Sequence, residues 1–142
     1  MVSENRISCL KYFPKGDKGG RIVEEMIKVI VAGGRDFSDY DLLKQTLNRL
    51  LMYKLPNVEI VCGKARGADT LGECYAKELG LPIAYFPADW DQFGKAAGYI
   101  RNKEMAKYAD ACVIFWDGQS KGSKHMYDLA LKEGIPTRIV RY

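Results

Sequence analysis

Five short apolar runs, separated by segments of helical periodicity, constrain the fold of this chain more than any other feature. They are rich in β-branched residues and span 28–32, 58–62, 83–86, 111–116 and 135–140. A continuous apolar run bounded by turn residues is typical of a strand buried on both faces of a sheet. Strands that alternate with helices predict a parallel sheet built from right-handed crossovers.

The segments between the runs carry helix signals. Residues 39–53 place leucines on one stripe after Ser38 or Asp39, either of which can cap the helix. Further helices are expected over 68–79, over 96–108 and from the loop 117–123 to Glu133, with Gly80 and Gly134 as stops. We therefore predict an α/β, Rossmann-like three-layer sandwich with a five-stranded parallel sheet of order 3-2-1-4-5.

Glycine-bearing loops follow the first, second and fourth runs. In the predicted strand order these loops meet at the carboxyl edge of the sheet, at the switch point where such folds bind ligands. The first loop offers backbone amides at Gly33 and Gly34, with Arg35 and Asp36 beside them. A glycine turn with a solvated arginine is the alternative interpretation of this loop.

The second loop joins an apolar run to a helix with two bases between glycines, Gly63-Lys64-Ala65-Arg66-Gly67-Ala68-Asp69. Backbone amides and cationic side chains before a helix N-terminus are suited to hold a phosphate. The loop lacks the GK[ST] ending of a P-loop. Asp69 either faces the ligand or caps its own helix, and the sequence leaves both open.

The third loop contains Asp117, Gly118, Ser120, Gly122 and Ser123 and precedes another helix. It can offer amides, hydroxyls and the positive end of the helix dipole to an anion. Ordinary capping by its serines is the alternative.

Two other stretches supply candidate ligand contacts. Arg101 and Asn102 lie early in a helix, where they either face the site or form surface contacts. Trp90 lies in the long loop 87–95, where its ring can wall a base or pack in the core. The lone His125 is expected to have a solvent or packing role.

Composition narrows the class of protein. The 142 residues carry a net charge of +4, and the basic residues are interspersed rather than clustered. This pattern allows an anionic ligand but argues against nucleic acid as the partner. The sequence contains no membrane-length apolar run, and its 4 cysteines form no metal-like spacing with the histidine. We expect a cytoplasmic protein without membrane contact, metal or cofactor.

The first 25 residues read differently, because they are charged, turn-rich and without periodicity. We expect residues 1–25 to be a poorly ordered extension of the ligand-binding domain, which is expected over residues 26–142.

The motifs together resemble a known family. Gly34-Arg35-Asp36-Phe37, Gly63-x-Ala65-Arg66-Gly67-Ala68-Asp69, Ala88-Asp89-Trp90, Arg101-Asn102-x-x-Met105 and Ser120-x-Gly122-Ser123 resemble the YspA-like, YpsA-related branch of the SLOG superfamily, which includes the DprA and LOG proteins. The resemblance covers residues 28–140. It implies a Rossmann-like domain that binds a nucleotide or a nucleotide-derived ligand.

The LOG enzymes are phosphoribohydrolases that activate cytokinins. Arg101 and Met105 match the spacing of their arginine and methionine, but Met126 stands at the position of their glutamate. Methionine can neither stabilise an oxocarbenium-like centre nor activate water, as carboxylates do in glycosidases. The carboxylates left for such chemistry are Asp36, Asp69 and Asp117.

We therefore predict a sensor or sequestering module for a nucleotide-derived small molecule, such as an ADP-ribose relative. One alternative is a nucleotide N-glycosidase that uses Arg101 with Asp69 or Asp117. Another is a DprA-like module that binds single-stranded DNA. Such binding needs a basic path leading away from the pocket, and the sequence offers few basic residues for one. A homodimer is compatible with the sequence.

Overall fold

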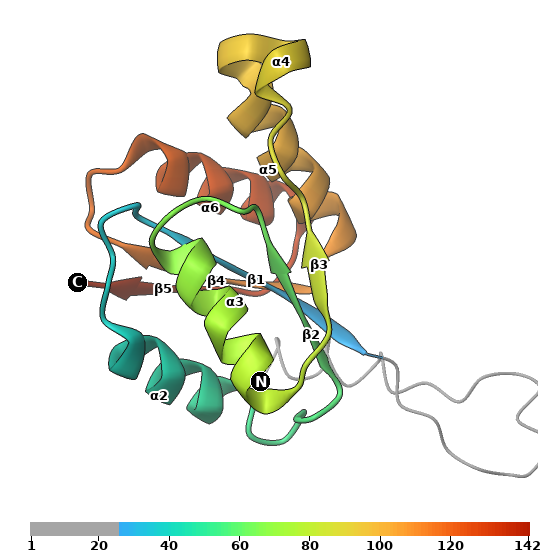
Figure 1. Ribbon diagram of the computed structural model, residues 1–142, viewed down its shortest axis with the longest axis vertical. Helices are drawn as coiled ribbons and strands as arrows, with labels where there is room; N and C mark the ends of the chain where they lie inside the picture. Colours follow the sequence, from blue (N-terminus) through green and yellow to red (C-terminus); the bar gives the residue numbers. More distant parts are fainter. Residues whose placement is uncertain (1–25) are drawn as a thin grey trace, which may run out of the picture.

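The computed structural model describes residues 26–142, and within them a parallel sheet of five strands runs in the order β3-β2-β1-β4-β5 (Figure 1). The strands are β1 (Ile27–Gly33), β2 (Val58–Cys62), β3 (Ile83–Tyr85), β4 (Ala111–Trp116) and β5 (Thr137–Arg141). The α/β class and the strand order predicted from the sequence are confirmed. The expectation for residues 1–25 lies outside the described residues.

Helices cover both faces of the sheet, as Figure 1 shows. Within residues 26–142 the four long helices are α2 (Tyr40–Leu50), α3 (Ala68–Leu79), α5 (Ala97–Tyr108) and α6 (Lys121–Glu133). Val29, Val31 and Ile60 point from the strands into the cluster that includes buried residues of α2 and α3. Ile30 and Ile114 point into the opposite cluster, with α5 and α6. This alternation of successive residues between two apolar layers explains why the central strands are largely apolar.

Side-chain caps mark the start of two of the long helices. Asp39 caps α2 by accepting a hydrogen bond from the Leu42 amide at 3.0 Å, and Ser120 caps α6. The sequence placed the end of α2 near Tyr53, but the helix ends at Leu50 and a series of turns leads to Pro56. A proline disfavours helical geometry in the residue before it, so Pro56 prevents the helix from continuing through Leu55.

One short helix was not expected. The segment 87–95, predicted to be a loop, contains α4 (Trp90–Phe93), which Asp89 caps through the Gln92 amide at 3.1 Å. Gly94, with φ of 57°, ends α4, and a 3₁₀ turn (Gly94–Ala96) continues into α5. Figure 1 shows α4 beyond the carboxyl edge of β3, standing away from the sheet. None of its residues is buried, so its sequence lacks the apolar stripe by which a helix can be predicted.

The central strands bring the candidate loops to one edge. β1 pairs with β4 in a register that ends with Gly33 opposite Phe115. A Cβ atom on Gly33 would lie 2.2 Å from the Phe115 carbonyl oxygen, so only glycine fits this junction. In residues 26–142, no helix has the length and apolar character needed to cross a membrane.

Candidate functional site

A pocket of about 410 Å³ lies at the carboxyl edge of the sheet, between the loops that follow β1, β2 and β4. Its volume falls within the range of roughly 300–1,000 Å³ that is usual for small-molecule sites. The predicted site residues that line it are Gly33, Gly34, Arg35, Asp36, Asp69, Arg101, Asn102, Asp117, Ser120, Gly122 and Ser123. The switch-point argument therefore locates a real cavity.

Gly67 joins the first two loops and does not line the pocket. Its φ of 79° lies in the left-handed region, and a Cβ atom there would stand 2.1 Å from the Gly34 carbonyl oxygen. That carbonyl accepts a hydrogen bond from the Ala68 amide at 3.3 Å. Gly67 therefore allows the β2–α3 loop to pack against the β1–α2 loop.

Asp69 is a buried carboxylate in the pocket wall, with 5% of its surface exposed. It does not cap α3, since its Oδ2 accepts hydrogen bonds from the Gly63 amide at 3.0 Å and from the Ala65 amide at 3.5 Å. Burial raises the pKa of Asp69 to about 6, although the Gly63 amide and the charge of Arg101 oppose the rise. Asp69 thus fixes the loop and presents a carboxyl group that titrates near neutrality.

Arg101 crosses from α5 to the β2–α3 loop. Its Nη1 donates to the Gly63 carbonyl oxygen, and its Nε donates to Asn102 Oδ1 at 2.9 Å. Within residues 26–142, Nη2 has no hydrogen-bond partner, and Arg101 lines the pocket. A Cβ atom on Gly63 would lie 2.3 Å from Nη1, so glycine at this position makes room for the guanidinium.

Asn102 and His125 extend this network through a contact that the sequence did not signal. Asn102 is buried, and its Nδ2 lies 3.3 Å from Nδ1 of His125 on α6. The Tyr99 and His125 rings pack in a T-shaped arrangement, with 4.4 Å between their centroids. Two polar residues on separate helices, 23 positions apart, give no local sequence signal of this contact.

The first turn of α6 forms the opposite wall. Asp117 Oδ1 accepts from the Gln119 and Ser120 amides at 2.8 and 2.9 Å, and Ser120 Oγ accepts from the Ser123 amide at 3.4 Å. Ser123 is 3% exposed, and its hydroxyl has no hydrogen-bond partner in the described chain. A buried hydroxyl without a partner is costly, so Ser123 leaves hydrogen-bonding capacity unsatisfied at this wall of the pocket.

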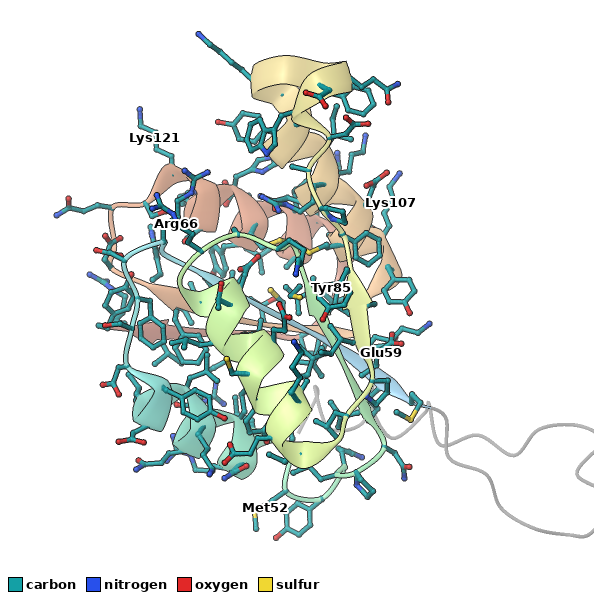
Figure 2. All side chains as sticks on the ribbon, in the orientation of Figure 1. Met52, Glu59, Arg66, Tyr85, Lys107 and Lys121 are labelled. Atoms are coloured by element: carbon teal, nitrogen blue, oxygen red, sulfur yellow. The ribbon has the colours of Figure 1, made fainter. Side chains whose placement is uncertain are left out.

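Four predicted contacts lie outside the pocket lining besides Gly63 and Gly67. The Lys64 ammonium lies 3.5 Å from Glu73 and 4.7 Å above the Tyr85 ring. Arg66 is exposed, and Figure 2 shows it at the same end of the molecule as Lys121, the first residue of α6. The other two are Trp90, which is 52% exposed on α4, and Gly118, which packs against the Arg141 guanidinium.

Met105 and Met126 supply the apolar part of the wall. Each is 1% exposed, and both belong to the core cluster beneath the pocket. Met126 occupies the position at which the LOG resemblance led us to look for a glutamate. Of the residues that line the cavity, the carboxylates are Asp36, Asp69 and Asp117.

The strand order and the cavity at its switch point define the molecule as a Rossmann-like α/β domain. The chain belongs to the YspA, cpYpsA-related SLOG family, whose sequence model matches residues 27–93. The Gene 61 protein of Mycobacterium phage D29 is 34% identical over 117 residues, a match that covers 78% of this chain and 94% of the phage protein. The predicted family resemblance is confirmed.

Two solved structures of DNA processing protein A (DprA) share the fold. The protein from Streptococcus pneumoniae superposes with a TM-score of 0.65 at 19% identity, over 80% of this chain and 50% of that one. The protein from Helicobacter pylori, described for its single-stranded DNA binding mode, gives 0.59 at 21% identity, over 81% and 65%. This chain therefore corresponds to between half and two thirds of the length of either DprA protein.

Proposed function

We propose that this domain binds a nucleotide-derived small molecule of the ADP-ribose class and acts as a sensor or sequestering module for it. The observation that carries the proposal is the buried, unpartnered hydroxyl of Ser123 in the first turn of α6. A helix of this length directs free amides and a partial positive charge at its N-terminus, and phosphate oxygens satisfy both the amides and the hydroxyl.

Arginines on two sides of the cavity complete the proposed phosphate site. Arg35 lines the pocket from the β1–α2 loop, and Arg101 presents Nη2 from α5. The three carboxylates that line the pocket are already engaged by hydrogen-bond donors, which limits how far they neutralise the two arginines. Asp36 accepts a hydrogen bond from the Tyr142 hydroxyl at 2.8 Å, and Asp117 accepts from two amides of its own loop. Asp69 accepts from the Gly63 and Ala65 amides, so donors already face all three acids.

Trp90 is the proposed stacking partner for the base. A Cβ atom on Gly98 would lie 3.7 Å from the tryptophan ring and 3.8 Å from Arg101 Nη2, so the ring and the guanidinium flank the same short segment of α5. The Trp90 side chain is 52% exposed, and stacking of a base on an exposed aromatic ring contributes about 1–3 kcal/mol.

Calorimetric titration tests the proposal. The panel consists of ADP-ribose, AMP, ribose 5-phosphate and inorganic phosphate, with fluorescence of Trp90 and Trp116 recorded in parallel. We expect ADP-ribose or AMP to bind and to perturb the fluorescence, and we expect Ser123→Ala to weaken that binding. Silence of the whole panel in both measurements would refute the proposal. An oligonucleotide titrated at low salt tests the DNA-binding alternative in the same way.

A nucleotide N-glycosidase is the second candidate, and Asp69 is the observation that favours it. A carboxyl group with a pKa near 6 at the wall of the pocket can exist in either protonation state at neutral pH, as a general acid or base requires. This candidate predicts free base on chromatography after incubation with AMP or ADP-ribose, and loss of the product in Asp69→Asn and Arg101→Ala. Recovery of intact nucleotide alone would eliminate it.

A homodimer remains a prediction from the sequence. Light scattering of the eluted protein distinguishes a monomer of 16.0 kDa from a dimer.

A further inference from the structure

A chain of hydrogen bonds connects the pocket to a histidine outside it. Arg101 donates from Nε to Asn102 Oδ1 at 2.9 Å, and Asn102 Nδ2 lies 3.3 Å from His125 Nδ1. The histidine does not line the pocket, although it stands two residues after Ser123 on α6. The packed pair α5 and α6 thus carries the network from one wall of the site to its outer side.

The chemistry of the three groups fixes the direction of each bond. A guanidinium only donates, so the atom that faces Arg101 Nε must be the amide oxygen of Asn102. The amide nitrogen therefore faces His125 and donates to it, which requires Nδ1 to be unprotonated and the proton of the neutral ring to reside on Nε2.

We propose that His125 is a positioning residue: its neutral Nδ1 holds the Asn102 amide in the one orientation that accepts from Arg101, and it thereby fixes the guanidinium at the ligand pocket. This inference rests on the proposed function for its consequence, ligand affinity, but its geometry can be tested without a ligand.

Protonation of the ring would break this arrangement. A protonated Nδ1 is a donor and would face the Asn102 amide nitrogen, also a donor. A reversed amide would satisfy the ring but would turn its nitrogen toward Arg101 Nε, so one contact is lost in either orientation. Burial lowers the pKa of His125, and Asp128 on the same helix opposes this effect. The ring is therefore neutral at physiological pH.

The surroundings of the ring agree with the neutral form. From α5, the Tyr99 ring packs on the histidine ring and the Asn102 amide nitrogen lies 3.3 Å from Nδ1, so α5 presents a donor and an aromatic ring to it. Asp128, the acid that acts on the ring, is itself paired with Lys124 at 3.0 Å.

Strands β1 and β4, which lie beneath α6, contain no carboxylate that would favour a protonated histidine. There β1 and β4 contribute apolar side chains and the Cys112 thiol to the shared core cluster. Burial raises the pKa of that thiol above its ordinary range, so it stays neutral as well. On β5, the Arg141 guanidinium lies against Gly118 and 5.7 Å from the Trp116 ring.

Two variants separate a positioning role from a packing role. His125→Asn places an amide oxygen close to the position of Nδ1 and cannot titrate in this range, whereas His125→Leu keeps the bulk and removes the acceptor. We expect hydrogen exchange at Arg101 Nε, followed by nitrogen NMR of the ligand-free protein, to become roughly tenfold faster in the leucine variant, since a charged hydrogen bond is lost. In the asparagine variant it should stay within about twofold of the parent.

The parent protein provides a test that needs no substitution. Nitrogen NMR should show Nδ1 of His125 unprotonated and Nε2 protonated at pH 7.5. Exchange at Arg101 Nε, corrected for its intrinsic pH dependence, should then accelerate as pH falls through the titration of His125. An Nδ1–H tautomer, or exchange that ignores that titration, would overturn the proposal even if a variant did not fold.

Affinity for ADP-ribose, measured by calorimetry at pH 7.5, gives the functional consequence. We expect the leucine variant to bind about tenfold more weakly and the asparagine variant to bind like the parent. Equal loss in both variants, with unchanged urea midpoints, would overturn the positioning role. If the parent fails to bind, the proposed function fails, while the exchange and tautomer measurements still decide the role of His125.

Discussion

Replacement of Ser123 by alanine should stabilise the ligand-free protein and weaken ligand binding. The hydroxyl is 3% exposed and lacks a partner within the described chain, so the folded state bears the cost of its lost hydration. Such a group costs roughly 1–3 kcal/mol, and alanine also has a higher helix propensity than serine. A buried water would recover part of the cost. We therefore expect stabilisation of about 1 kcal/mol in the absence of ligand.

Ser120, at the same helix end, offers a matched control of opposite sign. Its Oγ accepts from the Ser123 amide at 3.4 Å and caps α6. Removal of an N-cap hydroxyl costs about 0.5–2 kcal/mol, so Ser120→Ala should destabilise the protein. Two serines three positions apart thus differ in sign because one hydroxyl has a partner and the other has none.

Urea unfolding gives the two stability changes, and calorimetric titration gives the change in affinity. With ligand bound, the Ser123 hydroxyl would donate to a charged phosphate oxygen, a bond of about 1.5–3 kcal/mol. Its loss should weaken binding of ADP-ribose by roughly ten- to a hundredfold. If Ser123→Ala destabilised the free protein by 1 kcal/mol or more, or bound the ligand with unchanged affinity, the reasoning would be wrong.

Three further predictions concern other parts of the site. Because burial raises the pKa of Asp69 to about 6, the folded protein retains a proton that the unfolded chain releases near pH 4, so its stability should fall by roughly 2–3 kcal/mol as pH rises from about 4 to 7. Urea titrations across that range should show this loss, and Asp69→Asn should remove it. Gly63→Ala should displace Arg101 and reduce affinity for ADP-ribose. At Gly98 a Cβ atom meets only ordinary contacts, so Gly98→Ala should leave stability in the same unfolding assay equal or higher. Trp90→Ala should weaken AMP binding about tenfold without affecting ribose 5-phosphate; equal losses for both would contradict base stacking.

The fold could be predicted because its determinants are local. The central strands are largely apolar, since helices cover both of their faces, and that pattern is legible in residues 27–33 and 111–116. Turn residues mark the ends of the runs, and the crossover rule then leaves few strand orders. The location of the pocket followed from that order, because the carboxyl ends of β1 and β4 meet at the switch point.

Side-chain direction within the loops could not be predicted. Lys64 has a φ of 62°, and its ammonium lies with Glu73 and the Tyr85 ring instead of lining the pocket. A lysine in a glycine-bearing loop suggests a phosphate contact. The sequence does not show in which direction the side chain of a residue with positive φ will point. The four-residue helix α4 was missed for a related reason, since a segment without buried residues has no periodicity to detect.

The features that sequence rules predict poorly are concentrated around one cavity. Ser123 has an unpartnered hydroxyl, Asp69 is a buried acid with a raised pKa, and the neighbouring Lys64 has a backbone conformation that is uncommon outside glycine. Each costs free energy in the ligand-free fold, and such costs are usually retained where function requires them. A phosphate would satisfy the hydroxyl. The pocket-lining position on the same helix at which a carboxylate would serve bond cleavage is occupied by Met126. The first turn of α6, which carries the Ser123 hydroxyl, is therefore suited to hold a ligand. Asp69, the acid that a reaction would need, lies on α3.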